Sequence, residues 1–196
     1  MTLIGAWFDG RDRGYVWADS ECYFDGQPDG HVQKLFVNKE TGVAGCGTGT
    51  VSMMDSLKMV LGETEPVPFD RVVRRLCSHL RQEHAAAHNL RLNKIAEAME
   101  GWKFIVAGWS ERLFRIAVLH ADANYEPQFA ERVAASPYIS ELKDFSPSAT
   151  GDFLPIARAQ MHCIKRQIPG AGAGTLTVAR LFRGGVFEMA YEHAFE

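Results

Sequence analysis

The spacing of the hydrophobic residues changes repeatedly along this chain, from strand-like to helical and back. Strand-like runs fill the first part, two helical stretches follow at 51–61 and 69–90, and then come strands, one more helix and final strands. Blocks of strands and blocks of helices in this order are typical of antiparallel sheets that pack against helix layers. The sequence therefore predicts an α+β fold.

The start of the chain predicts an antiparallel meander over the first ~50 residues, from the alternation of apolar residues and the turns between them. The apolar run 2–8 is followed by a turn at 9–14, whose Asp-Gly pair is a strong hairpin signal, and by a return strand at 15–18. A third strand fits 31–37. A fourth begins at Val43 and enters the small-residue stretch GCGTGT.

The remainder predicts helices and strands in alternation. Apolar residues at helical spacing mark helices at 51–61 and from about 69 to 90. The segments KFIVAGW and FRIAVLH predict two strands, a loop region follows them, and the next helix holds Pro155 in its first turn. The segments TLTVARLF and GVFEMAYE predict the last two strands around a Gly-Gly turn.

Size and composition favour one domain over residues 1–196, with enough apolar residues for a sizeable core. The net charge of −3 argues against a nucleic-acid partner, and the lack of a long apolar run argues against a membrane partner. The four cysteines are widely spaced and form no C-x-x-C pair, which favours reduced thiols and a cytoplasmic protein. No cofactor and no metal ion are expected.

Several short patterns allow a second interpretation. The stretch GCGTGT lacks the Gly-Lys-Ser/Thr ending of a phosphate-binding loop, so a tight turn into a helix is expected. The GAGAG stretch at 170–174 is expected to be a turn, since no helix follows it. His84 and His88 have metal-ligand spacing, but no third ligand accompanies them, and a solvated helix face is expected. Cys46 is expected to be a buried thiol rather than part of a substrate pocket.

An ordered series of motifs points to a known family. The series consists of a threonine at position 2, a glycine-containing hairpin, Ala-Asp-Ser at 18–20, Val-Gln-Lys at 32–34, and the stretch VAGCGTGT before a helix. It resembles the proteasome β-subunit family, including the bacterial peptidase rings that work with an ATPase. The resemblance covers nearly the whole chain in element order and is most specific over residues 2–60. It implies the amino-terminal nucleophile (Ntn) hydrolase fold, a four-layer αββα sandwich of two antiparallel sheets flanked by helices.

The resemblance also implies the catalytic residues. Thr2 matches the nucleophile, Asp19 the aspartate of the second strand and Lys34 the lysine of the third strand. Gly45 matches the glycine whose backbone N–H faces the developing oxyanion. The family's Gly-Ser-Gly, whose serine supports the terminal amine, is replaced by Ala-Thr-Gly, so Thr150, or Ser148 just before it, is the nearest match.

The chemistry explains why such residues belong together. A threonine hydroxyl is a weak nucleophile at neutral pH and needs a base beside it. A free α-amine on the same residue can be that base, because its pKa of about 7.7–8.0 lies close to working pH. A nearby Lys34 ammonium would lower that pKa, and Asp19 would hold the lysine in place. In the given sequence Met1 precedes Thr2, so the amine becomes free only after Met1 is removed.

The resulting expectation is a threonine peptidase subunit of a self-compartmentalised ring that cleaves unfolded polypeptides. The resemblance implies a homo-oligomer with six or seven subunits per ring and two rings stacked face to face, with an ATPase unfoldase as a candidate partner. Two alternatives remain. One is a non-catalytic ring or scaffold protein of the same fold, and the other is an Ntn hydrolase that acts on a small amide.

Overall fold

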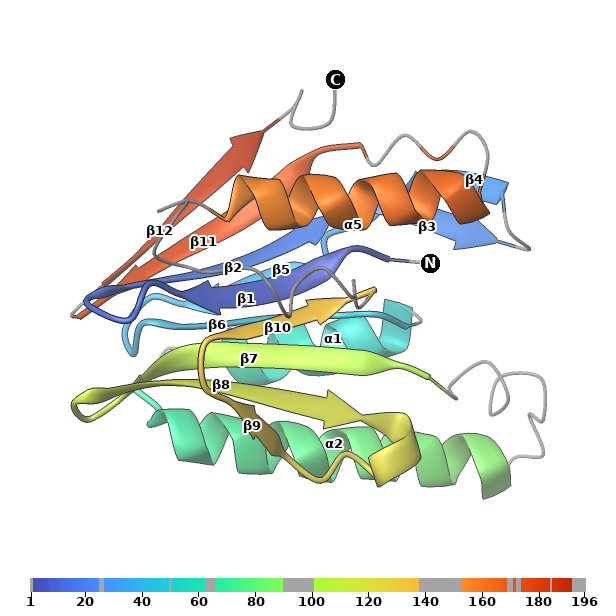
Figure 1. Cartoon of the computed structure of the whole chain (residues 1–196). Helices are drawn as coiled ribbons and strands as arrows, with labels where there is room; N and C mark the ends of the chain where they lie inside the picture. The colour runs from blue at the N-terminus through green and yellow to red at the C-terminus, as the bar shows by residue number, and fades with distance from the viewer. Residues whose placement is uncertain are drawn as a thin grey trace.

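The computed structural model describes most of the chain, namely residues 2–24, 27–49, 51–62, 66–89, 101–137, 153–168, 171, 174–183 and 185–191. Within these ranges the protein is an α+β structure whose strand pairs are antiparallel, so the predicted α+β class is confirmed. Figure 1 shows the arrangement of its helices and sheets.

The first sheet has the strand order β10-β1-β2-β11-β12. Its strands are β1 (Ile4–Phe8), β2 (Arg13–Asp19), β10 (Val133–Ser136), β11 (Leu176–Phe182) and β12 (Gly185–Tyr191). The predicted turn between β1 and β2 is present. The Asp9 side chain builds it, because Oδ1 accepts hydrogen bonds from the backbone N–H groups of Arg11, Asp12 and Arg13.

The second sheet has the order β5-β6-β7-β8-β9, and a two-stranded hairpin, β3-β4, stands apart. The strands of the second sheet are β5 (Leu35–Asn38), β6 (Val43–Gly47), β7 (Lys103–Ser110), β8 (Leu113–His120) and β9 (Gln128–Ala130). The hairpin consists of β3 (Glu21–Phe24) and β4 (Gln27–His31). The predicted strands at 101–120 and 175–191 are thus confirmed within a few residues.

The prediction of one antiparallel meander over the first ~50 residues is wrong, because the strands of this segment do not form a single sheet. Strands β1 and β2 belong to the first sheet, while β5 and β6 belong to the second, and β2 pairs with β11 instead of β5. The predicted strand at 31–37 also divides, because His31 ends β4 and β5 begins only at Leu35. The physical reason is that β1 and β2 are apolar on both faces, so their sheet needs a second layer on each side.

The helices agree with the sequence closely. They are α1 (Val51–Leu61), α2 (Phe69–Asn89) and α5 (Leu154–Gln167), and Pro155 lies in the first turn of α5, where no intrahelical N–H is required. The loop region predicted after residue 120 is only partly correct. It contains a 3₁₀ turn (Ala121–Ala123) and the short strands β9 and β10. The chain passes from the second sheet to the first between these two strands.

Three clusters of buried side chains lie between the layers. Helix α5 covers one face of the first sheet, where Ile156 and Met161 pack with Trp7 and Trp17. The other face packs against the second sheet through small and aliphatic residues such as Ile4. The outer face of the second sheet is covered by α1 and α2, as Figure 1 shows. Among the described helices, none combines the length and apolar character needed to cross a membrane.

Candidate active site

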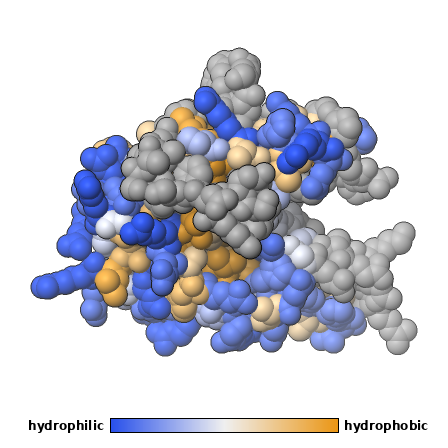
Figure 2. All heavy atoms as spheres, viewed as in Figure 1, coloured by the Kyte–Doolittle hydropathy of each residue, from blue (hydrophilic) through white to orange (hydrophobic). Residues whose placement is uncertain are grey.

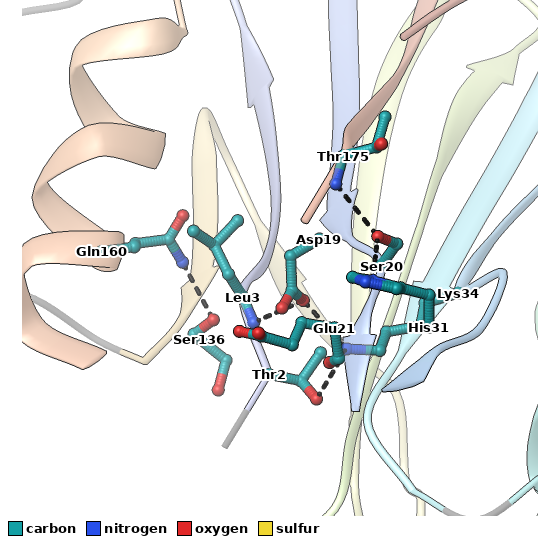
Figure 3. A network of polar contacts seen from close by, with 10 residues as sticks. All are labelled: Thr2, Leu3, Asp19, Ser20, Glu21, His31, Lys34, Ser136, Gln160 and Thr175. Atoms are coloured by element: carbon teal, nitrogen blue, oxygen red, sulfur yellow. Dashed lines mark hydrogen bonds and ion pairs between the residues drawn. The ribbon is translucent and has the colours of Figure 1, made fainter. Parts of the chain in front are cut away.

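Thr2, Asp19 and Lys34 meet at one end of the two sheets. The Lys34 Nζ atom lies 3.1 Å from Asp19 Oδ1 and donates a hydrogen bond of 3.3 Å to Thr2 Oγ1. Figure 3 shows the three side chains turned toward one another. The residues are at most 32 positions apart in the sequence, and the strands beside them belong to two different sheets.

Each of the three residues stands at the end of a strand. Thr2 lies two residues ahead of β1, Asp19 is the last residue of β2, and Lys34 directly precedes β5. The Asp19 N–H donates to the Leu3 carbonyl, and the Leu3 N–H donates back to Asp19 Oδ1 at 3.0 Å. This pair of bonds fixes the backbone beside Thr2 against the end of β2.

The Lys34 ammonium is held by three acceptors. Besides Asp19 Oδ1 and Thr2 Oγ1, it donates to the backbone carbonyl of Glu21. A lysine ammonium has three N–H donors, so each donor has a partner. Lys34 is 5% exposed, so its positive charge is fixed in a largely dry position next to the Thr2 hydroxyl.

Burial controls the charge state of Asp19. The carboxyl is 1% exposed, and its Oδ2 atom has no hydrogen-bond partner among the described residues. Burial raises the pKa of Asp19 to about 6, and this effect outweighs the lowering by the Lys34 charge and by the hydrogen bonds from Lys34 and Leu3. The negative charge of Glu21 adds a smaller upward shift in the same pKa.

Glu21 is a residue of this cluster that the sequence analysis did not single out. It begins β3, is 7% exposed, and contributes both its carbonyl to Lys34 and a negative charge near Asp19. The one feature of the sequence that could have indicated this role is an acidic residue two positions after Asp19. It was easy to miss because a charged residue in a short hairpin strand is usually solvent-exposed.

A second polar group, which the sequence also did not predict, borders the site. The Ser20 hydroxyl accepts a hydrogen bond of 3.0 Å from the Thr175 N–H and lies 3.1 Å from His31 Nδ1. Gly174 is in the left-handed region with φ +57°, and a Cβ there would lie 2.5 Å from Ser20 Oγ. These contacts tie the end of β2 to the start of β11 and to β4.

Gly45 is not placed among these contacts. It lies in the middle of β6, opposite Phe36 on β5, and a Cβ there would come within 2.9 Å of Leu61 and 3.0 Å of Leu57 on α1. The close approach of α1 therefore explains the need for glycine at this position. On β6, the glycine that bonds to Lys34 is Gly47, whose N–H donates to the Lys34 carbonyl at 3.3 Å.

Thr150 and Ser148, the candidates for supporting the terminal amine, lie outside the described residues. A different serine is close to the start of the chain. Ser136 on β10 is directly opposite Ile4 on β1, and Gln160 of α5 joins the two strands by donating 2.9 Å hydrogen bonds to the carbonyls of both residues.

The other patterns have structural explanations. The described part of the stretch GCGTGT, residues 45–49, forms the end of β6 and the two residues after it, and α1 begins at Val51. Cys46 is completely buried, which raises the pKa of its thiol well above the usual range and confirms the predicted buried thiol. His84 stacks on His88 at 5.0 Å and lies 3.2 Å from the Tyr125 hydroxyl. A search of the described residues finds no group of three or more side chains suited to a metal ion.

The arrangement places the positive charge of Lys34 beside the Thr2 hydroxyl at one end of the two sheets, and the buried Asp19 carboxyl contacts the same ammonium. A scan of the sequence against protein-family models finds no matching family, and a search among curated proteins finds no similar chain.

Proposed function

We propose that this protein is a threonine peptidase subunit of the Ntn-hydrolase class. The observation that carries the proposal is the contact of Lys34 Nζ with both Thr2 Oγ1 and Asp19 Oδ1. A fixed ammonium next to a hydroxyl near the start of the chain suits a nucleophile whose base is its own α-amine.

The layer packing supports the same class. One helix, two stacked antiparallel sheets and two further helices follow one another through the protein, which agrees with a four-layer αββα sandwich. In such a sandwich, the strand ends of both sheets can contribute side chains to one site, as β1, β2 and β5 do here.

In the proposed reaction, the peptide bond before Thr2 is first cleaved so that the α-amine is free. The neutral amine takes the Thr2 hydroxyl proton as Oγ1 attacks the substrate carbonyl. The tetrahedral intermediate collapses to an ester, and the leaving amine receives the proton. Water then attacks the ester, releases the carboxylic acid and returns Thr2 to its original state. The Lys34 ammonium lowers the pKa of the neighbouring amine by charge repulsion, and Asp19 holds Lys34 in position.

The proposed enzyme assembles into stacked homo-oligomeric rings, receives unfolded polypeptide, and works in the cytoplasm, where an ATPase could supply the substrate. Four free cysteine thiols support a reducing compartment. The non-catalytic alternative has one observation in its favour, because Gly45, the expected oxyanion donor, is packed under α1 and makes no described contact with Lys34.

Covalent labelling tests the proposal. The chain is produced behind a cleavable fusion so that Thr2 becomes the first residue, and it is treated with a peptide epoxyketone, which forms a ring with the hydroxyl and the amine of a terminal threonine. We expect the intact mass to rise by one probe molecule. Protein that retains Met1 and the Thr2→Ala variant, each otherwise identical, should stay unlabelled. A folded protein with free Thr2 that remains unlabelled and does not cleave peptides would favour the non-catalytic alternative.

A further inference from the structure

A cavity of about 450 Å³ lies between the two sheets on the side of β8, β9 and β10. It is lined by residues of β7, β8, β9 and β10, among them Lys103, Ile105, Val118, His120, Ala130 and Ser136. Figure 2 shows hydrophobic atoms exposed in the middle of this face, between the upper and lower parts of the protein. A volume of this size is within the range of small-molecule and side-chain pockets.

Strand register explains which side chains face the cavity. Ile105 on β7 belongs to the buried cluster between the sheets, and Lys103, two residues earlier, points to the same side. Directly opposite on β8 are His120 beside Lys103 and Val118 beside Ile105. The wall formed by β7 and β8 is therefore cationic at one end and aliphatic further inside.

The cationic end presents a lysine ammonium that is not fully buried. Within the described part of the chain, the Lys103 ammonium has no hydrogen bond or ion pair, and only the backbone of Lys103 is bonded, to Thr48. His120, by contrast, has a carboxylate partner, because its Nδ1 lies 3.3 Å from Asp122 Oδ2. Lys103 is partly buried, so an anion that reached it would be partly shielded from water.

The same end of the cavity is close to the candidate active site. Ser136 lines the cavity and is opposite Ile4, which follows Thr2 by two residues. Two residues of strand and one strand spacing correspond to a separation of roughly 8 Å. The Thr48 backbone bonds to Lys103, and its neighbour Gly47 bonds to Lys34, so one short segment connects both lysines.

We propose that this cavity binds a carboxylate carried on an apolar stem, with the carboxylate paired with Lys103 and the stem packed against Ile105 and Val118. The ligand is either an acidic side chain of the polypeptide substrate or a small free organic acid. The first source rests on the function proposed above, whereas the second does not.

Binding is measured by calorimetry on the complete chain with Met1 present and Thr2→Ala, so that catalysis has no influence. The probes are 4-phenylbutyrate and its neutral amide, and blocked peptides that differ only in a central Glu or Gln. We expect the acid to bind roughly tenfold or more tightly than the amide, because a charge-assisted hydrogen bond is lost in the amide.

Variants locate the binding. Lys103→Met should remove the preference for the acid, while Lys103→Arg should keep it. Ala130→Leu, which fills part of the cavity from edge strand β9, should weaken the binding of the acid and of the amide by the same factor. Lys58→Met is the matched control on the exposed face of α1 and should change nothing. Circular dichroism verifies that each variant is folded.

The outcomes separate the possibilities. Equal binding of acid and amide, no binding of either at millimolar concentration, or acid binding that a folded Lys103→Met protein retains would overturn the proposal. If the Glu peptide binds and this binding requires Lys103, the ligand is an acidic side chain of the polypeptide substrate. If 4-phenylbutyrate binds and the Glu peptide does not, the ligand is a small free organic acid. Since the background is inactive, failure of covalent labelling at Thr2 would leave this result intact.

Discussion

A buried ammonium with three acceptors is the central feature at the scale of single residues. Lys34 is only 5% exposed, so Asp19 and two further oxygen atoms replace most of the hydration of its charge. A side chain that served only to cover the sheet edge would not need this arrangement. The residue-scale predictions therefore concern the two charged partners.

The Lys34→Met substitution should abolish peptide cleavage by protein with free Thr2 and should destabilise the fold in a pH-dependent way. Without the ammonium, Asp19 is buried beside Glu21 with no counter-charge, which costs about 3–5 kcal/mol when the carboxyl is ionised. The cost should be smaller at pH 5, where Asp19 takes up a proton. Urea unfolding of both proteins at pH 5 and pH 7.5 measures this difference, and an equal loss at both values would contradict it.

The raised pKa of Asp19 should also affect the stability of the unchanged protein. In the unfolded chain this carboxyl loses its proton near pH 4, whereas in the folded protein it keeps it until about pH 6. Between these values unfolding releases a proton, so the free energy of unfolding should fall as pH rises, by on the order of 3 kcal/mol in total from this group. Above about pH 6 the contribution should be constant.

The control for this effect is Asp19→Asn, which cannot titrate. Unfolding free energies of both proteins are compared from pH 4 to pH 7. The difference between the two curves should change across this interval and then level off. Parallel curves would mean that the Asp19 pKa is not raised in the folded protein.

At the scale of secondary-structure elements, one glutamine side chain joins helix α5 to three strands. Gln160 of α5 is fully buried, accepts a 2.9 Å hydrogen bond from the Trp17 indole on β2, and donates to carbonyls of β1 and β10. The Gln160→Leu substitution leaves the indole N–H buried without its acceptor. We expect a loss of about 2–3 kcal/mol in the free energy of unfolding, measured with urea. Lys165→Leu, a change on the exposed face of the same helix, is the comparison, and similar losses in both would contradict the assigned role.

Gly45 gives a test that separates packing from catalysis. A Cβ at this position contacts the ends of two leucines of α1, so Gly45→Ala should cost roughly 1–3 kcal/mol in stability because α1 must shift. If packing is its main role, the folded variant with free Thr2 should retain kcat within about tenfold. A much larger loss of kcat, in the range of roughly 10²–10³ seen when an oxyanion donor is removed, would restore Gly45 to the oxyanion site.

The sequence predicted most of the elements and much less of their pairing. Helix α2 was identifiable because its apolar residues recur at helical spacing over six turns, and the β1-β2 hairpin because Asp9-Gly10 marks its turn. Strand β10 was missed because its residues, VAAS, have little strand propensity by themselves and are held by pairing with β1. Alternation within a strand does not reveal its neighbour, so the assignment of β5 to a second sheet was not predictable.

The candidate site was predictable only in part, because local motifs can be recognised in the sequence whereas contacts that depend on strand pairing cannot. Thr2, Asp19 and Lys34 carry recognisable local motifs, and each lies at a strand end, where side chains of different sheets can meet. Glu21 and Ser136 have no such motif, and their positions depend on the β3-β4 hairpin and on β10. The unpaired Lys103 was not predictable either, since a lysine at the start of a strand is usually exposed to solvent.

At the scale of the whole molecule, the open question is whether the chain works alone. A nucleophile that cleaves peptide bonds must be kept away from folded proteins, and a closed ring of subunits would do this by enclosing the site in a chamber. Cyclic symmetry requires two different contact patches on each subunit. The family resemblance predicts that α1 and α2 form the layer through which two such rings would stack.

The outer face of α2 provides the means to test this assembly. Arg71 and Arg74 are exposed on it, and Arg74 donates to the Asp70 carbonyl of its own helix, whereas Arg81 is paired with the Glu126 carboxylate. Among the described residues of α2, Arg71 and Arg74 therefore offer exposed positive charge to a neighbouring subunit. We expect light scattering after size exclusion to give about twelve to fourteen times the 21.8 kDa of one chain, the mass of two stacked rings of six or seven subunits. The charge reversal Arg71→Glu with Arg74→Glu should halve the mass by separating the stacked rings, while Arg11→Glu in the β1-β2 turn should leave it unchanged. A stable monomer with free Thr2 at micromolar concentration would instead favour a hydrolase of small amides, because an unenclosed site suits a small substrate.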